Sequence, residues 1–233
     1  SGLRQAVSEY LDREREAVEE GIDELGAYSP FRKGAHPAEQ DEEKCLHDTS
    51  AFNPEIGPQP ASGGAPSYTA AFTEAIVKEG EARPELVAIT AAMPGSTGLL
   101  PFQERFPDRF VDVGIAEQHA VTAAAGMAMG GLRPVVAVYS TFLSRAFDQA
   151  NLDVGLHGLP VVFCLDRAGI TGDDGPSHHG VLDLVLLSKV PGMTIFAPSS
   201  YQELQVMPHD ALDLCTGPAA LRWAKPTARE VAD

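Results

Sequence analysis

Glu117 stands between two apolar segments of different character, and this is where the sequence first suggests chemistry. Residues 110–115 have the composition of a short strand, and residues 120–130 are almost entirely small and apolar. A helix with so little polar surface is expected to be buried. Glu117 then lies at the mouth of a buried helix, where low dielectric raises the proton affinity of a carboxyl group and allows it to donate a hydrogen bond. The alternative is an ordinary helix-terminal carboxylate, which stabilises by ~0.3–1 kcal/mol through the helix dipole.

A second group of polar residues lies in a long glycine-rich loop, 168–180, directly after Arg167. Its glycines allow the backbone to approach a ligand closely. The loop carries two carboxylates and two imidazoles, Asp173, Asp174, His178 and His179. Such groups can bind a divalent ion. Adjacent histidines do not converge easily on one ion, however, and no distant ligand motif accompanies them, so we predict no metal site here.

The elements that would position these groups alternate along the chain from residue 66 onward. Continuous apolar, Val/Ile-rich runs predict strands at 86–91, 110–115, 134–140, 160–165, 193–197 and 219–223. The segments between and before them predict helices at 67–79, 117–129, 142–152, 182–187 and 201–212. This alternation is typical of an α/β fold with a mostly parallel sheet and helices on both faces. Ligands bind at the carboxyl ends of strands in such sheets, and the candidate residues lie at those ends.

The first 65 residues have a different pattern. Apolar residues recur at near-helical spacing over residues 3–25, which predicts a charged helix. Residues 28–66 are rich in Pro, Gly, Ser and acidic residues, which predicts an extended linker. We therefore divide the chain into residues 1–65, a helix and linker, and residues 66–233, the α/β domain.

Composition narrows the classes of partner. The net charge is −16 and the isoelectric point about 4.7, which disfavours binding to nucleic acid or to an anionic membrane. No apolar run approaches the ~20 residues that span a bilayer. The cysteines are three in number and widely spaced, as expected of a protein in a reducing cytoplasm.

Three blocks of sequence together carry a family resemblance. They are Gly114–Val121, Tyr139–Gln149 and Asp166–Gly180. All three resemble the 1-deoxy-D-xylulose-5-phosphate synthases, a branch of the transketolase-like enzymes that depend on thiamine diphosphate, and the resemblance runs from about Ser62 to Arg222. It implies the thiamine diphosphate-binding fold, with residues 66–233 as its pyrimidine-binding domain and residues 1–65 as a remnant of the first domain.

The activity implied by the resemblance is a transferase reaction. Pyruvate condenses with D-glyceraldehyde 3-phosphate to give 1-deoxy-D-xylulose 5-phosphate and carbon dioxide, a step toward isoprenoids and thiamine. The resemblance also implies a cytoplasmic homodimer with thiamine diphosphate and Mg²⁺ as cofactors. In the family a separate domain with a Gly-Asp-Gly motif binds the diphosphate and the metal. That motif is not found in this sequence, so we expect the chain to be an incomplete part of the enzyme and inactive alone.

The resemblance assigns cofactor contacts to four residues. Glu117 is expected to hydrogen-bond the ring nitrogen of the aminopyrimidine and so to be catalytic. Phe142 is expected to stack on that ring, with Tyr139 and Arg145 beside it. Core packing is the alternative for both aromatic residues, and a salt bridge is the alternative for Arg145.

The substrate contacts implied by the resemblance lie further along the chain. His178 is expected to act in proton transfer near the reacting carbon, and Asp174 to contact the hydroxyl groups of the acceptor aldehyde. Arg167 and Arg222 are expected to bind the acceptor's phosphate, because a planar guanidinium suits a bidentate phosphate contact. Tyr139 is counted with the substrate site as well. A surface ion pair is the alternative for Arg222.

Two other functions remain open at the level of sequence. A transketolase half or a 2-oxo acid dehydrogenase β-subunit would share Glu117, although neither has the 166–180 block. The second alternative function is that of a non-catalytic pyrimidine-domain subunit or scaffold. In that case the small-residue helix at 117–130 could form a dimer contact, because close packing needs small side chains.

Overall fold

The computed structural model describes residues 67–225 and Ala228, with only the backbone of Asp173. The predicted helix at 3–25, the linker at 28–66 and the division near residue 65 lie outside the described residues. They stay predictions.

Six strands form one sheet in which every neighbouring pair is parallel. The strands are β1 (Leu86–Thr90), β2 (Phe110–Asp112), β3 (Arg133–Tyr139), β4 (Val162–Asp166), β5 (Thr194–Phe196) and β6 (Ala219–Arg222). Their order across the sheet is β2-β1-β3-β4-β6-β5. The predicted parallel α/β fold is confirmed, and the carboxyl ends of β3, β4 and β6 therefore lie side by side.

The strand predicted at 110–115 is shorter in the structure, because β2 ends at Asp112. The Asp112 carboxylate accepts the backbone N–H of Gly114 at 3.0 Å, and Gly114 adopts a left-handed φ of 70°. A side-chain contact of this kind turns the chain out of the strand. The same carboxylate accepts the N–H of Ala92 at 2.7 Å and thereby joins the ends of β1 and β2.

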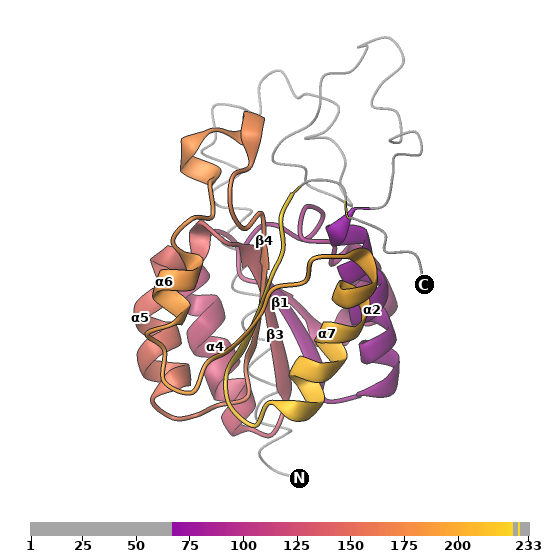
Figure 1. Ribbon diagram of the computed structural model, residues 1–233. Coiled ribbons are helices and arrows are strands. Elements are labelled where there is room, and N and C mark those ends of the chain that lie inside the picture. The colour runs from indigo at the N-terminus through magenta and orange to yellow at the C-terminus, as the bar shows by residue number, and fades with distance from the viewer. Residues whose placement is uncertain (1–66, 226–227, 229–233) are drawn as a thin grey trace, which may run out of the picture. The chain divides into compact units, whose positions relative to one another are not determined.

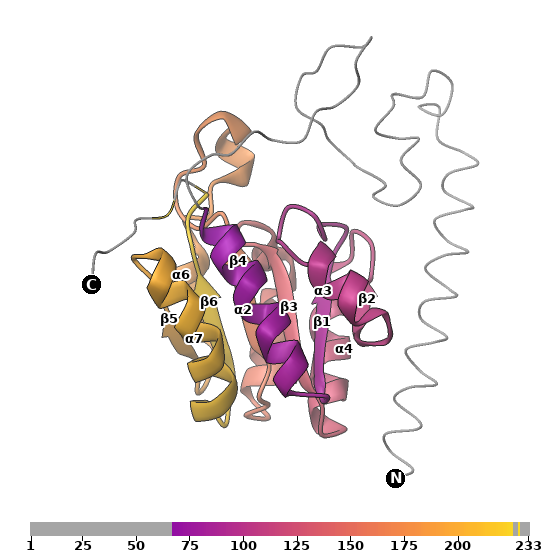
Figure 2. The ribbon, with the colours of Figure 1, turned by 90° about the vertical axis from the view of Figure 1, so that its right-hand side faces the viewer.

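Helices cover both faces of the sheet, which Figure 1 shows nearly edge-on with α4, α5 and α6 on the left and α2 and α7 on the right. Figure 2 shows α2 in front of the sheet. The helices are α2 (Tyr68–Ala82), α3 (Leu100–Arg105), α4 (Glu117–Met129), α5 (Phe147–Gln149), α6 (Asp183–Leu187) and α7 (Tyr201–Leu214). Serine hydroxyls cap α2 and α7, each accepting a backbone N–H of the first turn, as N-caps commonly do. The helix α3 was not predicted from the sequence.

The single helix predicted at 142–152 is wrong. A 3₁₀ turn, η3 (Phe142–Ala146), comes first, then α5, then a π-helical turn, η4 (Ala150–Gly155). Ala146 leaves helical geometry at φ −112° and ψ 18°, which separates η3 from α5. The π turn brings Gly155 against Val190, so closely that an added Cβ would lie 2.5 Å from its side chain. Packing, which the apolar pattern does not encode, sets these local helix types.

The core has two parts, one on each face of the sheet. On one face α4 presents Ala120 and Ala124, both fully buried, to the sheet, which confirms that the small-residue helix is buried. On the other face the Phe72 ring stacks on the Trp223 indole with 4.7 Å between centroids. Small side chains let α4 approach the sheet closely, and this places Glu117, its first residue, directly at the carboxyl edge of the sheet.

Candidate functional site

The candidate residues gather where three neighbouring strands end. Tyr139 is the last residue of β3, Asp166 of β4 and Arg222 of β6. The loop that follows β4 and contains His178 rises from this edge, drawn in orange at the upper left of Figure 1. In a doubly covered parallel sheet this is the position at which ligands bind.

Glu117 lies at the N-terminus of α4 with 3% of its side chain exposed. Its carboxylate accepts a hydrogen bond from Nη1 of Arg145 at 2.9 Å, and Arg145 is itself 47% exposed. The Arg145 guanidinium also lies 4.6 Å from the centre of the Phe142 ring. One flat cation thus contacts both a buried carboxylate and an aromatic face.

Two aromatic rings and one imidazole form the centre of the site. The rings of Tyr139 and Phe142 are stacked, with 5.6 Å between centroids and 14° between planes. His178 meets both rings edge-on, at 5.4 Å from Phe142 and 6.4 Å from Tyr139. The Arg167 guanidinium lies 4.0 Å from the centre of the Tyr139 ring, which is within the range of a cation–π contact. Burial raises the pKa of Tyr139 above its ordinary value.

The loop 168–180 is closed at its base by backbone hydrogen bonds. The N–H of Gly169 donates to the carbonyl of Gly180 at 2.9 Å, and the N–H of Gly180 donates back at 2.8 Å. Gly180 has no space for a side chain, because an added Cβ would lie 2.6 Å from the carbonyl oxygen of Arg167. Higher in the loop, Nδ1 of His179 accepts the N–H of Thr171 at 3.2 Å. These contacts hold the loop in the shape that brings His178, the residue before His179, onto the aromatic pair.

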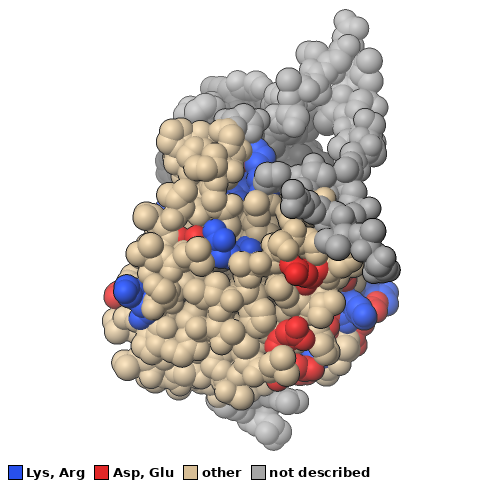
Figure 3. Space-filling view, in the orientation of Figure 1, with Lys and Arg blue, Asp and Glu red and all other residues tan. Residues whose placement is uncertain are grey.

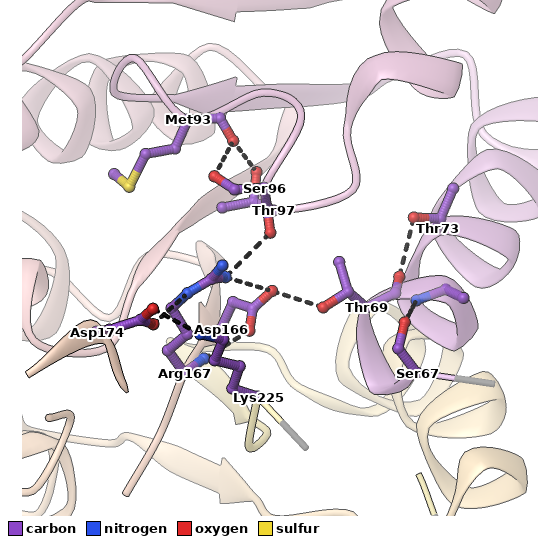
Figure 4. Close-up of polar contacts among 11 residues, drawn as sticks. Ser67, Thr69, Thr73, Met93, Ser96, Thr97, Asp166, Arg167, Asp174 and Lys225 are labelled. Atoms are coloured by element: carbon purple, nitrogen blue, oxygen red, sulfur yellow. Dashed lines mark hydrogen bonds and ion pairs between the residues drawn. The ribbon is translucent and has the colours of Figure 1, made fainter. Parts of the chain in front are cut away.

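Arg167 is the centre of a polar cluster that Figure 4 shows in close-up. Its Nε lies 3.3 Å from Asp174, and its Nη1 donates to the carbonyl of Ser96 at 3.3 Å. Lys225 contacts the other oxygen of Asp174 at 2.5 Å. That lysine contact is the main reason why the pKa of Asp174 lies below its ordinary value. The structure therefore brings Arg167, Asp174 and Lys225 together, and the predicted substrate contacts of Arg167 and Asp174 stay predictions.

Asp166 and Thr69 are polar contributors that the sequence analysis did not single out. The Asp166 carboxylate is fully buried, accepts the Thr69 hydroxyl at 2.7 Å, and accepts the N–H of Arg167 at 2.6 Å. Burial raises its pKa, while the contacts with Thr69 and Arg167 oppose that rise. A carboxylate at the end of an apolar strand is a signal that sequence reasoning could have used. The sequence gives no such signal for Thr69.

Arg222 is held by a carboxylate of the same chain. Its Nε donates to one oxygen of Asp183 at 2.6 Å and its Nη2 to the other at 3.3 Å. Asp183 is the first residue of α6 and only 1% of its side chain is exposed. The structure thus gives Arg222 a bidentate partner, and its predicted contact with a substrate phosphate stays a prediction.

The surface at α6 and the two residues before it carries several exposed apolar side chains. Four apolar side chains there are between 46% and 59% exposed, Val181, Leu182, Leu184 and Val185. Figure 3 shows few charged side chains over α5 and α6. Within the described residues no three His, Cys, Asp or Glu side chains are placed to share a metal ion. None of the described helices combines the length and apolar character needed to cross a membrane.

Comparison with proteins of known sequence identifies close relatives. The chain is 55% identical over 192 residues to the 1-deoxy-D-xylulose-5-phosphate synthase of Mycobacteroides abscessus and 54% identical over 192 residues to that of Mycobacterium tuberculosis. Each match covers 82% of this chain and 30% of the relative, so the chain spans about a third of the length of these curated relatives.

Solved structures agree on the fold. A split-gene transketolase described as an inactive beta4 tetramer superposes with a TM-score of 0.65 at 29% identity, over 73% of this chain and 55% of that one. The transketolase of Pichia stipitis, at 16% identity and a TM-score of 0.65, shares the fold over 73% of this chain and 27% of its own. The family model for the transketolase pyrimidine-binding domain matches residues 64–230, so the chain belongs to the family of transketolase pyrimidine-binding domains.

Proposed function

We propose that this chain is the pyrimidine-binding part of a thiamine diphosphate-dependent transferase that makes 1-deoxy-D-xylulose 5-phosphate and carbon dioxide from pyruvate and D-glyceraldehyde 3-phosphate. The observation that carries the proposal is the 54–55% identity to synthases of that name over 192 residues. Because the chain spans about 30% of those relatives, the activity belongs to a longer protein or assembly.

The described residues fit the pyrimidine ring of the cofactor that the family implies. Arg145 places a flat hydrogen-bonding group against both Glu117 and Phe142. A planar aminopyrimidine needs the same two contacts, a carboxyl group in its plane and an aromatic ring on its face. Glu117 and Phe142 would therefore hold that ring, with Tyr139 and Arg145 beside it. When bound, thiamine diphosphate supplies the carbon nucleophile that attacks the keto group of pyruvate.

Glu117 would hydrogen-bond the pyrimidine ring nitrogen and exclude water from it, since the carboxylate is 3% exposed. His178 would move the proton at the substrate oxygen. Its Nδ1 lies 3.0 Å from the Ser177 hydroxyl, so Nε2 would be the nitrogen that acts on the substrate. A positioned general acid within hydrogen-bond reach accelerates such a step by ~10²–10⁴-fold.

The acceptor's phosphate would bind Arg167, with Arg222 as the second predicted contact. Arg167 uses Nε and Nη1 in the contacts described above, and Nη2 has no partner among the described residues. A phosphate oxygen can therefore be added to the guanidinium. Asp174 would hydrogen-bond a hydroxyl group of the aldehyde while Lys225 keeps it ionised.

We also assign to the complete protein a Mg²⁺ ion, held with the diphosphate by its other domain, a homodimeric state and a cytoplasmic location. The exposed apolar side chains in and just before α6 support self-association, because exposed apolar side chains that lie close together commonly mark an interface. Light scattering on the purified protein measures the dimer, and titration of thiamine diphosphate with and without Mg²⁺ measures the ion's contribution.

Replacing Glu117 by Ala in the complete protein tests the proposed function. The turnover rate should fall by ~10²-fold or more if Glu117 supports the cofactor. Replacing the exposed neighbour Gln118 by Ala is the matched control and should leave the rate unchanged. A non-catalytic subunit is the competing function, and a related solved chain is described as inactive. A Glu117→Ala protein with full activity would favour that alternative and defeat the proposal.

A further inference from the structure

Arg167 holds an uncommon backbone conformation. Its φ is +61°, in the left-handed region that residues with a Cβ rarely occupy. Such a residue keeps this conformation only where its surroundings impose it, and residues of this kind concentrate at functional sites. The contacts that impose it at Arg167 are all present in the described structure.

The Asp166 carboxylate fixes both the backbone and the side chain of Arg167. One oxygen, Oδ1, accepts the backbone N–H of Arg167 at 2.6 Å. The other, Oδ2, lies 3.6 Å from Nη1 of the same residue. The carboxylate is fully buried, so solvent does not compete for either contact.

Thr69 fixes the carboxylate in turn. Its hydroxyl donates to Oδ2 of Asp166 at 2.7 Å, as Figure 4 shows. Thr69 lies in the first turn of α2, where the Ser67 hydroxyl caps the helix by accepting the N–H of Ala70 at 3.0 Å. A rigid helix end therefore sets the orientation of the Asp166 carboxylate from across the sheet edge.

We propose that Thr69 and Asp166 are positioning residues, which hold the Arg167 guanidinium over Tyr139 in the orientation that binds the phosphate of the acceptor substrate. The inference rests on the proposed function. Neither residue needs to touch the substrate, because the Asp166 carboxylate transmits the position of α2 to Arg167. The separation of the two residues along the chain explains why the pattern of the 166–180 block alone does not show the arrangement.

The test uses Thr69→Val in the complete protein. Valine keeps the shape of threonine and removes the hydroxyl donor, so the fold should be preserved. A hydrogen bond to a charged group is typically strong enough that its loss changes binding by about tenfold or more. We expect the KM for D-glyceraldehyde 3-phosphate to rise by about tenfold, with kcat and the KM for pyruvate changed by less than about twofold. Thr69→Ser keeps a hydroxyl and should restore the original KM.

Thr73→Val is the matched control. It removes a threonine hydroxyl one turn further along α2, where the donor contacts the carbonyls of Thr69 and Gly98 instead of Asp166. Its KM for the acceptor should equal that of the unmodified protein. An equal rise of that KM in Thr69→Val and Thr73→Val would show general loosening of α2 and overturn the inference.

A double-mutant cycle with Arg167→Met separates this inference from the proposed function. If Thr69 acts through Arg167, Thr69→Val should have no further effect on the acceptor KM in the Arg167→Met background. The same rise in both backgrounds would overturn the inference. An acceptor KM that Arg167→Met itself leaves unchanged would refute the phosphate-binding role of Arg167 and with it this inference. The proposed function would survive that result, and it would fail instead if the complete protein does not turn over pyruvate and D-glyceraldehyde 3-phosphate. A crystal structure of the Thr69→Val protein should show the Arg167 guanidinium displaced from Tyr139.

Discussion

The pair between Arg222 and Asp183 makes a quantitative prediction about stability. The Asp183 side chain is 1% exposed and Arg222 is 19% exposed, and two hydrogen bonds of 2.6 and 3.3 Å join them. Removing one partner of a buried pair leaves the other charge uncompensated and costs about 3–5 kcal/mol. Because Arg222 keeps some contact with solvent, we expect Arg222→Met to lower the free energy of unfolding by about 3 kcal/mol, the low end of that range.

Thermal unfolding of the purified chain measures this change. For a chain of this size about 1 kcal/mol corresponds to 2–4 °C, so Arg222→Met should lower Tm by roughly 6–12 °C. Adding Asp183→Leu should recover part of the loss, because no buried charge then remains. The recovery should be incomplete, since Asp183 also accepts the N–H of Leu184 at 2.8 Å.

Two results would refute this reasoning. A Tm within about 2 °C of the original protein would show that the pair contributes little and that Arg222 is available to a ligand. A double variant less stable than Arg222→Met would show that the Asp183 carboxylate needs no cation. If Arg222 mainly binds the substrate phosphate, Arg222→Met should raise the acceptor KM in the complete protein with little change in Tm.

Three further predictions follow from individual contacts. Gly180→Ala should move the loop and reduce activity of the complete protein, because its Cβ would lie 2.6 Å from the Arg167 carbonyl; an unchanged rate would contradict this. Burial raises the pKa of the Cys164 thiol, so iodoacetamide should alkylate it only after unfolding, and mass spectrometry of native protein should find it unmodified. The pKa of Asp174 is lowered from 3.8, chiefly by Lys225, so its contribution to stability should be complete well above pH 3.8 and lost as pH falls through the lowered pKa. Urea unfolding of Asp174→Asn should therefore differ from the original chain at neutral pH and converge with it in acid; a difference that persists at low pH would contradict this.

Composition alone was sufficient to predict α4. A run of small apolar residues after Glu117 indicated a buried helix at 117–129, and the structure has the same bounds. The reason is local, because the left-handed Gly114 and the non-helical Ala116 fix where the helix begins. Alternation of apolar runs with helical patterns likewise predicted the parallel sheet, since both faces of each strand must be buried.

Packing decides what the apolar pattern left undetermined. The sequence predicts one helix at 142–152, yet residues 142–155 divide into three kinds of helical turn. The spacing of apolar residues over so short a segment does not distinguish a 3₁₀-helix, with three residues per turn, from an α-helix with 3.6 or a π-helix with more. The helix α3 was missed for a related reason, because Pro94, Gly95 and Gly98 precede it and Pro101 lies in its first turn, a composition typical of loops.

The pairing of charges at the site could not be read from the sequence. The resemblance placed Arg145, Arg167 and Arg222 near ligands, but their contacts with Glu117, Asp174 and Asp183 depend on which loops meet at the sheet edge. Thr69 and Asp166 are 97 residues apart in the sequence and meet only because α2 lies beside the end of β4. Partners so distant along the chain leave no local pattern.

These arginine–carboxylate pairs determine how an anionic substrate can bind at the site. All three arginines of the site already face a carboxylate. An anionic substrate must therefore use a guanidinium nitrogen that has no partner among the described residues, such as Nη2 of Arg167, or displace a carboxylate. Asp174 is 23% exposed and shares its charge with Lys225, whereas Asp183 is 1% exposed and bound in bidentate fashion. Separating a buried bidentate pair is the more costly exchange. Arg167 should therefore accept a phosphate more readily than Arg222 does.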